Sequence, residues 1–363
     1  MKRIEVMVGA CGVLAFGLVA GCSSTSDHSN WTQMPPTGYH DAPALHSDPV
    51  IMLGAKASRT SFGPAADAEI DFDATGPVKL RVVTFNMEHR DRSKELDGVA
   101  AELPEETGGR PEFLLLQEVK FRSGKSNLND NTAESLGEKL GYNVRATKRE
   151  SDGEGIAILS KYPFEFYDAI THKAQTSGLL LGFKRVSVMG EFKVPRIGLV
   201  RVVNVHFTNW DFDARIRRKQ LTETLEWLAA RDRVKPAEIT ILGGDFNIER
   251  DSGDLAMVMD SKLTGTIKFA DYNGTLPTRG SPGHPTKRID YVFIATHDDK
   301  LRMLGEQRLF MDGLIAENGR SRYWPSDHVP VFHEYAVTPV DGSRLASAHT
   351  PSVINQLPLT ATE

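Results

Sequence analysis

The sequence contains almost no cysteine. Of its 363 residues only Cys11 and Cys22 are cysteines, and both lie close to the N-terminus. The rest of the chain therefore cannot form a disulfide bond. If the protein is exported to an oxidising compartment, its fold must be held by a hydrophobic core of sufficient size and not by covalent cross-links.

Other features are also missing. The 43 lysines and arginines are outnumbered by 48 aspartates and glutamates, which gives a net charge of −5 and argues against a tight, non-specific DNA-binding protein. We find no internal repeat and no glycine-rich phosphate-binding loop. The composition, 40% hydrophobic and 25% charged, excludes a mainly disordered or fibrous chain. One domain of roughly 200–250 residues, or two smaller ones, fits this length.

The N-terminal segment has the pattern of an export signal. Lys2 and Arg3 precede an apolar stretch at residues 6–19, which is shorter than the ~20 residues that a spanning helix needs. The sequence LVAGC at residues 18–22 resembles the lipobox of bacterial lipoproteins. This resemblance implies a signal peptide at residues 1–21, a lipid anchor on Cys22 and a place at the cell envelope. Because Ser23 follows, it also implies outer-membrane sorting in cells that have one. The alternative is an ordinary secretory cleavage site beside a chance cysteine.

The rest of the chain divides into three parts. Residues 22–78 are predicted to be a lipidated tether and linker, residues 79–337 the folded domain, and residues 338–363 a polar tail. Amphipathic patterns predict helices at residues 133–140 and 213–231. Because short apolar runs outnumber these helices, we expect an α/β domain with a partly antiparallel core. The predicted strands lie at residues 80–85, 113–116, 155–159, 185–192, 199–205, 239–242, 289–294 and 329–335.

Potential metal ligands and proton-transfer groups lie at the ends of these predicted strands. Asparagine, aspartate and glycine often end strands simply because they form turns. Asp290 is more informative, because a carboxylate inside an apolar strand is costly to bury without a partner. His328 is its natural partner. The groups are Asn86 and Glu88, Gln117 and Glu118, His206, Asp245 and Asn247, Asp290, and Asp327 and His328.

Six short motifs together resemble the endonuclease/exonuclease/phosphatase superfamily. Each is weak alone, but their order and their strand-like flanks make the set specific. The resemblance implies a four-layer αββα sandwich, in which two mixed β-sheets pack face to face with helices outside and the site lies at one end. The motifs are Phe85-Asn86, Gln117-Glu118, Asn204-Val205-His206, Gly244-Asp245-Phe246-Asn247, Arg288-Ile289-Asp290-Tyr291 and Ser326-Asp327-His328.

The resemblance also implies a metal centre. Asn86 and Glu118 match the metal-binding pair of the family, and Glu88 and Asp327 are candidates for a second metal ion or for the residues around the first. Carboxylate and amide oxygens suit Mg²⁺ or Mn²⁺ better than zinc. The ion would neutralise charge on the non-bridging oxygens of a phosphoester.

Five further residues are expected to be catalytic. His328 with Asp290 forms a candidate acid–base dyad, in which His328 activates water or contacts the phosphate. Asp245 and Asn247 would position the water and the scissile phosphate. His206 would bind the phosphate or protonate the leaving group, and a histidine here resembles the pancreatic-type deoxyribonucleases and the sphingomyelinases.

The expected activity is therefore the divalent-metal-dependent hydrolysis of a phosphoester by attack of water. Among phosphoesters, a phosphodiester is favoured. The substrate is a nucleic acid or a lipid or sugar phosphate, the membrane contact is the lipid anchor, and no protein partner is predicted. The alternative is a catalytically inert surface-binding module on the same fold. A basic cluster at Arg215, Arg217, Arg218 and Lys219 either attracts an anionic substrate or is a solvated helix face. Four aromatic residues flank the motifs and either stack on bases, lie at a lipid interface or pack the rim: Trp210, Phe212, Tyr323 and Trp324.

Overall fold

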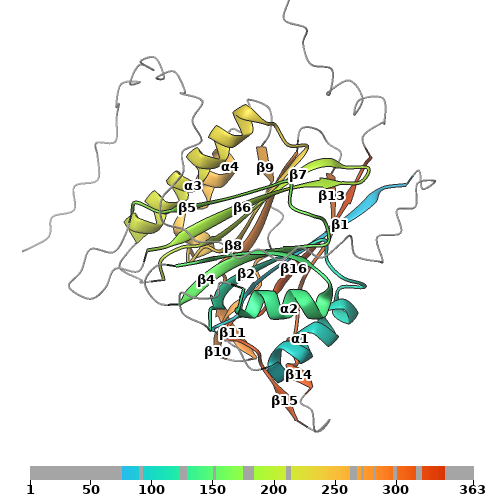
Figure 1. The fold of residues 1–363 in the computed structure, drawn as a ribbon. Helices are drawn as coiled ribbons and strands as arrows, with labels where there is room; N and C mark the ends of the chain where they lie inside the picture. Colours follow the sequence, from blue (N-terminus) through green and yellow to red (C-terminus); the bar gives the residue numbers. More distant parts are fainter. Residues whose placement is uncertain are drawn as a thin grey trace, which may run out of the picture. The chain divides into compact units, whose positions relative to one another are not determined.

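Two six-stranded β-sheets form the centre of the protein (Figure 1). The computed structural model describes residues 76–89, 93–122, 129–149, 153–174, 184–209, 214–261, 268–270, 274–281, 283–296, 301–315 and 321–339. All of them belong to one structural unit, which spans residues 51–363. The predicted signal peptide, Cys22 and most of the predicted linker and tail lie outside the described residues.

The first sheet is mixed. Only β1 and β2 run parallel, and every other neighbouring pair is antiparallel. The C-terminal strand β16 lies between β13 and β1, so the two ends of the described chain meet in this sheet. In spatial order the strands are β13 (Leu301–Arg308), β16 (Val331–Val337), β1 (Val78–Asn86), β2 (Phe113–Lys120), β4 (Glu154–Ser160) and β3 (Asn143–Lys148).

The second sheet repeats this plan. Its one parallel pair, β7 and β8, is again central and is flanked by antiparallel neighbours. In spatial order the strands are β5 (Phe166–Thr171), β6 (Val186–Val194), β7 (Gly198–His206), β8 (Ile239–Asp245), β12 (Asp290–Thr296) and β9 (Lys268–Ala270). Two short hairpins complete the described strands: β10 (Arg279–Ser281) with β11 (His284–Lys287), and β14 (Leu314–Ile315) with β15 (Arg322–Tyr323).

Helices cover the outer face of each sheet. Figure 1 shows α1 (Ser93–Glu106) and α2 (Thr132–Leu140) on the first sheet, and α3 (Ala214–Val234) with the short α4 (Ala256–Asp260) on the second. A 3₁₀ turn, η2 (Arg250–Ser252), precedes α4. No helix among the described residues is long and apolar enough to cross a membrane. The four layers confirm the predicted αββα sandwich.

Three apolar clusters lie between the four layers. On β1, Leu80 and Val82 point into the cluster between the two sheets, whereas Val83 and Phe85 point into the cluster beneath α1 and α2. This alternation follows from the two-residue period of a strand. The third cluster packs α3 and α4 on the second sheet, with Leu228 as one contact. Each fully buried aliphatic side chain contributes roughly 1.5–3 kcal/mol, so no disulfide is required.

Local patterns predicted helices α2 and α3 and missed helix α1 and the short α4. The helices expected at residues 133–140 and 213–231 are α2 and α3, although residue 213 itself is outside the described part. Helix α1 was not predicted. Its buried residues Leu96, Val99 and Leu103 have helical spacing, but acidic residues and Pro104 dilute the pattern. Strand β3 was missed because four of its six residues are polar.

Candidate active site

The ends of strands from both sheets meet at one edge. Asn86 ends β1 and is paired in register with Gln117, one residue before Glu118 on the parallel neighbour β2. In the second sheet Asp245 ends β8 and lies in register with His206 on β7 and with Asp290 on β12. Parallel neighbours end at the same edge of a sheet, and the antiparallel β12 begins where β8 ends. The topology therefore gathers these polar side chains.

Asn86 connects the two sheets. Its amide Nδ2 lies 3.1 Å from Oε1 of Glu118 and 3.0 Å from Oδ2 of Asp245. Its Oδ1 accepts a hydrogen bond from the backbone N–H of Glu88. In this orientation Asn86 is a donor between two carboxylates, and rotation of the amide by 180° presents its oxygen to a cation at the same place.

His328 and Asp290 form a buried pair. His328 Nδ1 lies 2.9 Å from Asp290 Oδ2, and the hydroxyl of Thr278 donates to the same oxygen at 2.6 Å. Burial lowers the pKa of His328, but the negative charge of Asp290 outweighs this effect and raises the pKa to about 9. The other oxygen of Asp290, Oδ1, is buried and has no hydrogen-bond partner among the described residues.

Asp245 lies beside this pair in a second buried position. Its Oδ2 is 3.8 Å from His328 Nε2. Burial, followed by the negative charge of Asp290, raises the pKa of Asp245 to about 7. One ligand atom from each of Asp245, Asp290 and His328 lies within 4.8 Å of the other two. The group thus holds two carboxylates in a space where their mutual repulsion favours a bound cation or a shared proton.

His206 faces both groups of carboxylates. Its Nε2 lies 3.6 Å from Asp245 Oδ2 and 3.8 Å from Glu118 Oε1. The guanidinium of Arg185 has Nη1 at 3.1 Å from each ring nitrogen. Burial and the positive charge of Arg185 hold the pKa of His206 well below its usual value, so the ring is neutral. Sequence reasoning did not identify Arg185, whose only signal was a cation at the start of an apolar run.

Asn247 supports Asp245 from the loop after β8. Its backbone N–H donates to Asp245 Oδ1 at 2.9 Å, and its side-chain Nδ2 donates to the carbonyl of Phe207 at 3.0 Å. Its φ of 50° is in the left-handed region, where asparagine is one of the better-tolerated residues. Asn247 therefore fixes the orientation of Asp245 and lines the space next to it.

Glu88 and Asp327 lie together at another side of the site. The backbone N–H of Asp327 donates to Oε2 of Glu88 at 3.1 Å. The Asp327 carboxylate is 3.4 Å from Nε of Arg279 through one oxygen and 3.9 Å from Nε2 of His328 through the other. These contacts join the end of β1 to the segment before β16. Their role as metal ligands stays a prediction.

The residues around Glu118 fit a hard divalent cation. Burial raises the pKa of Glu118, but hydrogen bonds with His89 and Asn86 help to outweigh this effect, and the pKa lies far below its usual value. An anionic carboxylate next to an amide and a second carboxylate is an oxygen donor set, which suits Mg²⁺ or Mn²⁺. The same cation would relieve the repulsion between the buried carboxylates.

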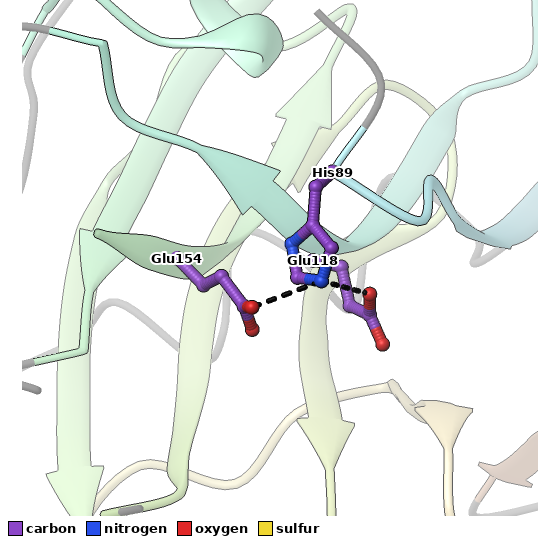
Figure 2. A group of neighbouring side chains, drawn as sticks. All are labelled: His89, Glu118 and Glu154. Carbon is purple, nitrogen blue, oxygen red and sulfur yellow. Dashed lines mark ion pairs between the residues drawn. The ribbon is translucent and has the colours of Figure 1, made fainter. Parts of the chain in front are cut away.

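Two neighbours of Glu118 were missed from the sequence. Figure 2 shows the ring of His89 between the carboxylates of Glu118 and Glu154. His89 follows β1 closely, and Glu154 begins β4, a strand apart in the sheet from β1. The only signal for His89 was its place just after a strand end rich in polar residues, and Glu154 gave none.

Two of the motif residues lie beneath the site and not in it. Gln117 and Asn204 are fully buried, and Gln117 Nε2 donates to Asn204 Oδ1 at 2.7 Å. Asn204 in turn donates to the carbonyls of Leu116 and Ala157 at 3.0 and 2.8 Å. Since Gln117 and Asn204 come from different sheets, this network ties the sheets together below the polar edge.

A polar cavity of about 300 Å³ adjoins Asn247. Three cations, Arg217, Arg279 and Lys287, line it together with Glu249 and Asp254. Arg217 comes from the basic cluster at the start of α3. The neighbouring Arg218 is instead held by Asp254, and Arg215 and Lys219 are exposed.

The aromatic residues considered for the rim are only partly described. Tyr323 packs against the cluster beneath α1 and α2, and its hydroxyl donates to the carbonyl of Lys94 at 3.3 Å. Trp324 donates from its ring nitrogen to the carbonyl of Met311 at 3.3 Å. These contacts fit a packing role. The other two, Trp210 and Phe212, lie outside the described residues.

Solved structures with the same architecture were found, although no curated protein matches the sequence. An endonuclease/exonuclease/phosphatase family protein from Bacteroides thetaiotaomicron superposes with a TM-score of 0.54 at 19% identity, over 72% of this chain and 98% of its own. A mannosyl-6-phosphatase from the same organism gives 0.54 at 20%, over 70% and 99%. TDP2 from Caenorhabditis elegans gives 0.52 at 18%, over 72% and 74%. At such identities the likeness establishes the fold alone.

A family model extends the comparison to the sequence. The model described as "Endonuclease/Exonuclease/phosphatase family" matches residues 83–328, which is more than half of the chain and includes every motif from Asn86 to His328. Members of this family are phosphoester hydrolases that depend on a divalent metal. The chain therefore belongs to the endonuclease/exonuclease/phosphatase family.

Proposed function

We propose that this protein is a Mg²⁺- or Mn²⁺-dependent hydrolase that cleaves a phosphodiester by direct attack of water. The observation that supports this most is the meeting of Glu118, Asn86 and Asp245 with the His328–Asp290 pair at one edge of both sheets. A metal ion at Glu118 and Asn86, with Glu88 and Asp327 nearby, would neutralise the charge on the phosphate and act as a Lewis acid.

The two shifted pKa values divide the remaining work between His328 and Asp245. With a pKa of about 9, His328 carries its proton at neutral pH, so we assign its Nε2–H to the phosphate. With a pKa of about 7, Asp245 is suited to accept a proton from the attacking water. Asp290 keeps His328 oriented through Nδ1, and Asn247 keeps Asp245 oriented through its backbone N–H.

His206 is assigned to phosphate binding. Sequence reasoning left two roles open, phosphate binding and protonation of the leaving group. Burial and Arg185 keep the ring neutral, and a neutral imidazole is a poor proton donor but a good hydrogen-bonding group. Arg185 lies directly against His206, so its charge is also available to the phosphate.

The substrate is proposed to carry negative charge beyond the scissile phosphate. Arg217, Arg279 and Lys287 line the cavity next to Asn247, and the ion pairs of Arg279 and Lys287 are partly exposed, so a substrate anion can replace the carboxylates at small cost. Both a nucleic acid and a lipid or sugar phosphate meet this requirement. Among structural neighbours, one is a mannosyl-6-phosphatase and another is TDP2 from D. rerio in complex with a single-stranded DNA product.

We further propose that the protein is located at the cell envelope. The LVAGC sequence supports removal of residues 1–21 and a lipid on Cys22, with residues 22–78 as the tether to a domain at 79–337 and a polar tail after it. If the cell has an outer membrane, the serine after Cys22 supports sorting to it.

The test is a substrate screen with the purified full chain. DNA, RNA, sphingomyelin, phosphoinositides and simple phosphomonoesters are each incubated with Mg²⁺ or Mn²⁺, with EDTA, and with the Glu118→Gln variant. We expect hydrolysis of at least one diester that both EDTA and the substitution abolish. Tight binding of a phosphoester with no turnover in either metal would support the inert binding module instead.

A further inference from the structure

One ring nitrogen of His89 serves two carboxylates. His89 Nε2 lies 2.8 Å from Oε2 of Glu118 and 2.9 Å from Oε1 of Glu154, and Figure 2 shows the ring held between them. The two carboxylates lie on different strands, because Glu118 is on β2 and Glu154 begins β4. The histidine therefore links the proposed metal ligand to a second acidic residue that lies further from the catalytic pair.

The two oxygens of Glu118 have separate surroundings. Oε1 faces the site, where Asn86 Nδ2 is 3.1 Å away and His206 Nε2 is 3.8 Å away. Oε2 faces His89. A carboxylate contacted on one oxygen only can rotate about its last side-chain bond, whereas a carboxylate contacted on both oxygens cannot do so without losing a bond. His89 thus determines which oxygen Glu118 presents to a cation.

His89 is itself held in place. The other oxygen of Glu154, Oε2, forms an ion pair with the buried guanidinium of Arg149. The backbone N–H of Arg149 also donates to the carbonyl of Glu154 at 2.7 Å, which fixes the end of the β3–β4 pair. The contacts form a chain from Arg149 through Glu154 and His89 to Glu118. Partners of metal ligands commonly form such chains.

The backbone supports the same arrangement at a cost. Glu118 lies at an irregularity between Gln117 and Val119 in the β2–β4 pairing, and its φ is 53°. His89 has a φ of 56°. Non-glycine residues are strained in this region, and bulges of this kind re-aim a side chain. The side chains of these two residues meet, with His89 Nε2 at 2.8 Å from Glu118 Oε2.

We infer that His89 is a positioning residue for the metal site: it holds the Glu118 carboxylate so that Oε1 faces the cation, and Glu154 with Arg149 holds His89. The inference rests on the proposed function only in requiring that Glu118 binds a divalent ion. Loss of such a partner of a metal ligand typically weakens metal affinity by about 10–100-fold.

The test measures metal binding directly. Mn²⁺ is titrated calorimetrically into the metal-free full chain and into the variants His89→Ala, His89→Gln and Glu154→Gln, each first checked for an unchanged thermal unfolding curve. His284→Ala is the matched control, because His284 is an exposed histidine on β11. Turnover is then measured for each variant as a function of Mn²⁺ concentration, with a substrate from the screen described above.

We expect the Kd for Mn²⁺ to rise about 10–100-fold in His89→Ala. The increase should be smaller in His89→Gln, which keeps a donor, and smaller in Glu154→Gln. Turnover should return to near the wild-type level at saturating Mn²⁺, and His284→Ala should match the wild type. Such recovery would not follow if His89 only maintained the fold.

Four outcomes would overturn the inference. The first is an unchanged Kd in His89→Ala, and the second is a turnover defect that saturating Mn²⁺ does not correct. The third is the loss of one of two binding events in His89→Ala, which would make His89 a direct ligand. The fourth is the absence of Mn²⁺ binding by the wild type. Failure of the proposed function looks different. In that case the wild-type chain hydrolyses no phosphoester, while the calorimetric comparison still decides the role of His89.

Discussion

Two acidic residues at the same edge of the sheets, Glu118 and Asp245, have pKa values shifted in opposite directions. Hydrogen bonds with His89 and Asn86 help to overcome burial and lower the pKa of Glu118, whereas burial and the nearby Asp290 raise that of Asp245 to about 7. A permanently anionic carboxylate is suited to a metal ion, and one that titrates near neutrality is suited to proton transfer. The surroundings of the two carboxylates therefore assign their roles.

Replacement of Glu118 tests the metal assignment. Glu118→Gln keeps the size of the side chain but removes its charge, so we expect metal-dependent hydrolysis to be lost while the far-UV circular dichroism and unfolding temperature stay close to wild type. Exposed Glu138 on α2 provides the control substitution Glu138→Gln. Activity at the wild-type level in Glu118→Gln would show that the ion binds elsewhere.

Replacement of His328 tests the catalytic pair. We expect His328→Ala to lower kcat by at least about 10²-fold, because it removes the charged Nε2–H that we assign to the phosphate. Asp290→Asn should give a smaller loss, because His328 remains but loses its anionic partner at 2.9 Å. The kcat of both variants is measured by steady-state kinetics at saturating Mg²⁺. A mild effect of His328→Ala would mean that Asp245 acts without help from His328.

The sequence predicted, through their motifs, several residues that the structure gathers in the candidate site, because a residue at the end of a predicted strand can be located without knowing the fold. Asn86, Glu118, Asp245 and His328 belong to this class. Arg185 and Glu154 do not, because nothing near them in the sequence shows that one reaches His206 and the other His89. Such contacts depend on which strands become neighbours, and that is decided by the whole sheet.

At the level of elements, α3 is fixed to the second sheet by a fully buried ionic group. Arg201 on β7 lies 2.7 Å from Asp232 on α3 and 2.9 Å from Glu191 on β6, and all three side chains are fully buried. Arg231 near the end of α3 also binds Glu191, at 2.8 Å. Removal of a single partner would leave uncompensated charge in the interior.

We therefore expect Arg201→Met to lower the free energy of unfolding by about 3–5 kcal/mol, since it removes from the interior the cation that two buried carboxylates share. Lys79→Met removes an ion pair with Glu334 in which the lysine is 64% exposed, and should cost less than about 1 kcal/mol. Urea unfolding curves of both variants give the comparison. Equal costs would mean that the buried group adds no more than a surface pair.

Elements with one strong periodicity were predictable, and elements that depend on their neighbours were not. The apolar runs that became β2, β7 and β8 are buried along nearly their whole length, so their composition alone was sufficient. Edge strand β13 carries exposed and polar residues and exists because β16 pairs with it. The residues of β13 have no periodic pattern that would predict this pairing with β16.

For the molecule as a whole, buried His333 makes stability depend on pH. Burial and the charge of Arg288 lower the pKa of His333 to about 3, whereas an unfolded histidine titrates near ~6.5. Below pH ~6.5 the unfolded chain binds a proton at this histidine, whereas the folded chain does not. The contribution of neutral His333 to the free energy of unfolding is therefore complete above pH ~6.5 and is lost progressively as the pH falls toward 3. The slope from this group approaches about 1.4 kcal/mol per pH unit.

The variant His333→Gln should lack this part of the pH dependence. Between pH 7 and pH 5 we expect the wild-type free energy of unfolding to fall by roughly 2 kcal/mol more than that of the variant, as measured by urea unfolding at each pH. Exposed His284 supplies the control, His284→Gln, whose pH dependence should follow the wild type. Parallel curves for wild type and His333→Gln would refute the contribution of His333.

The proposed lipid anchor also concerns the whole protein. We expect Cys22→Ser to release the protein from the membrane fraction, because the lipid has no other attachment point in the LVAGC sequence. Cys11→Ser, inside the predicted signal peptide, should leave membrane association unchanged. Fractionation followed by immunoblotting separates these cases, and a Cys22→Ser protein that stays with the membrane would contradict the anchor.

The position of β16 between β13 and β1 has a consequence for biosynthesis. A chain leaves the ribosome N-terminus first. The strands of the second sheet are therefore complete before β16, at residues 331–337, has appeared, while β1 still lacks one of its two neighbours. His328 emerges just ahead of that final strand. We therefore expect the catalytic group to be incomplete until residues 328–337 have emerged, and cleavage that removes β16 to abolish any hydrolysis.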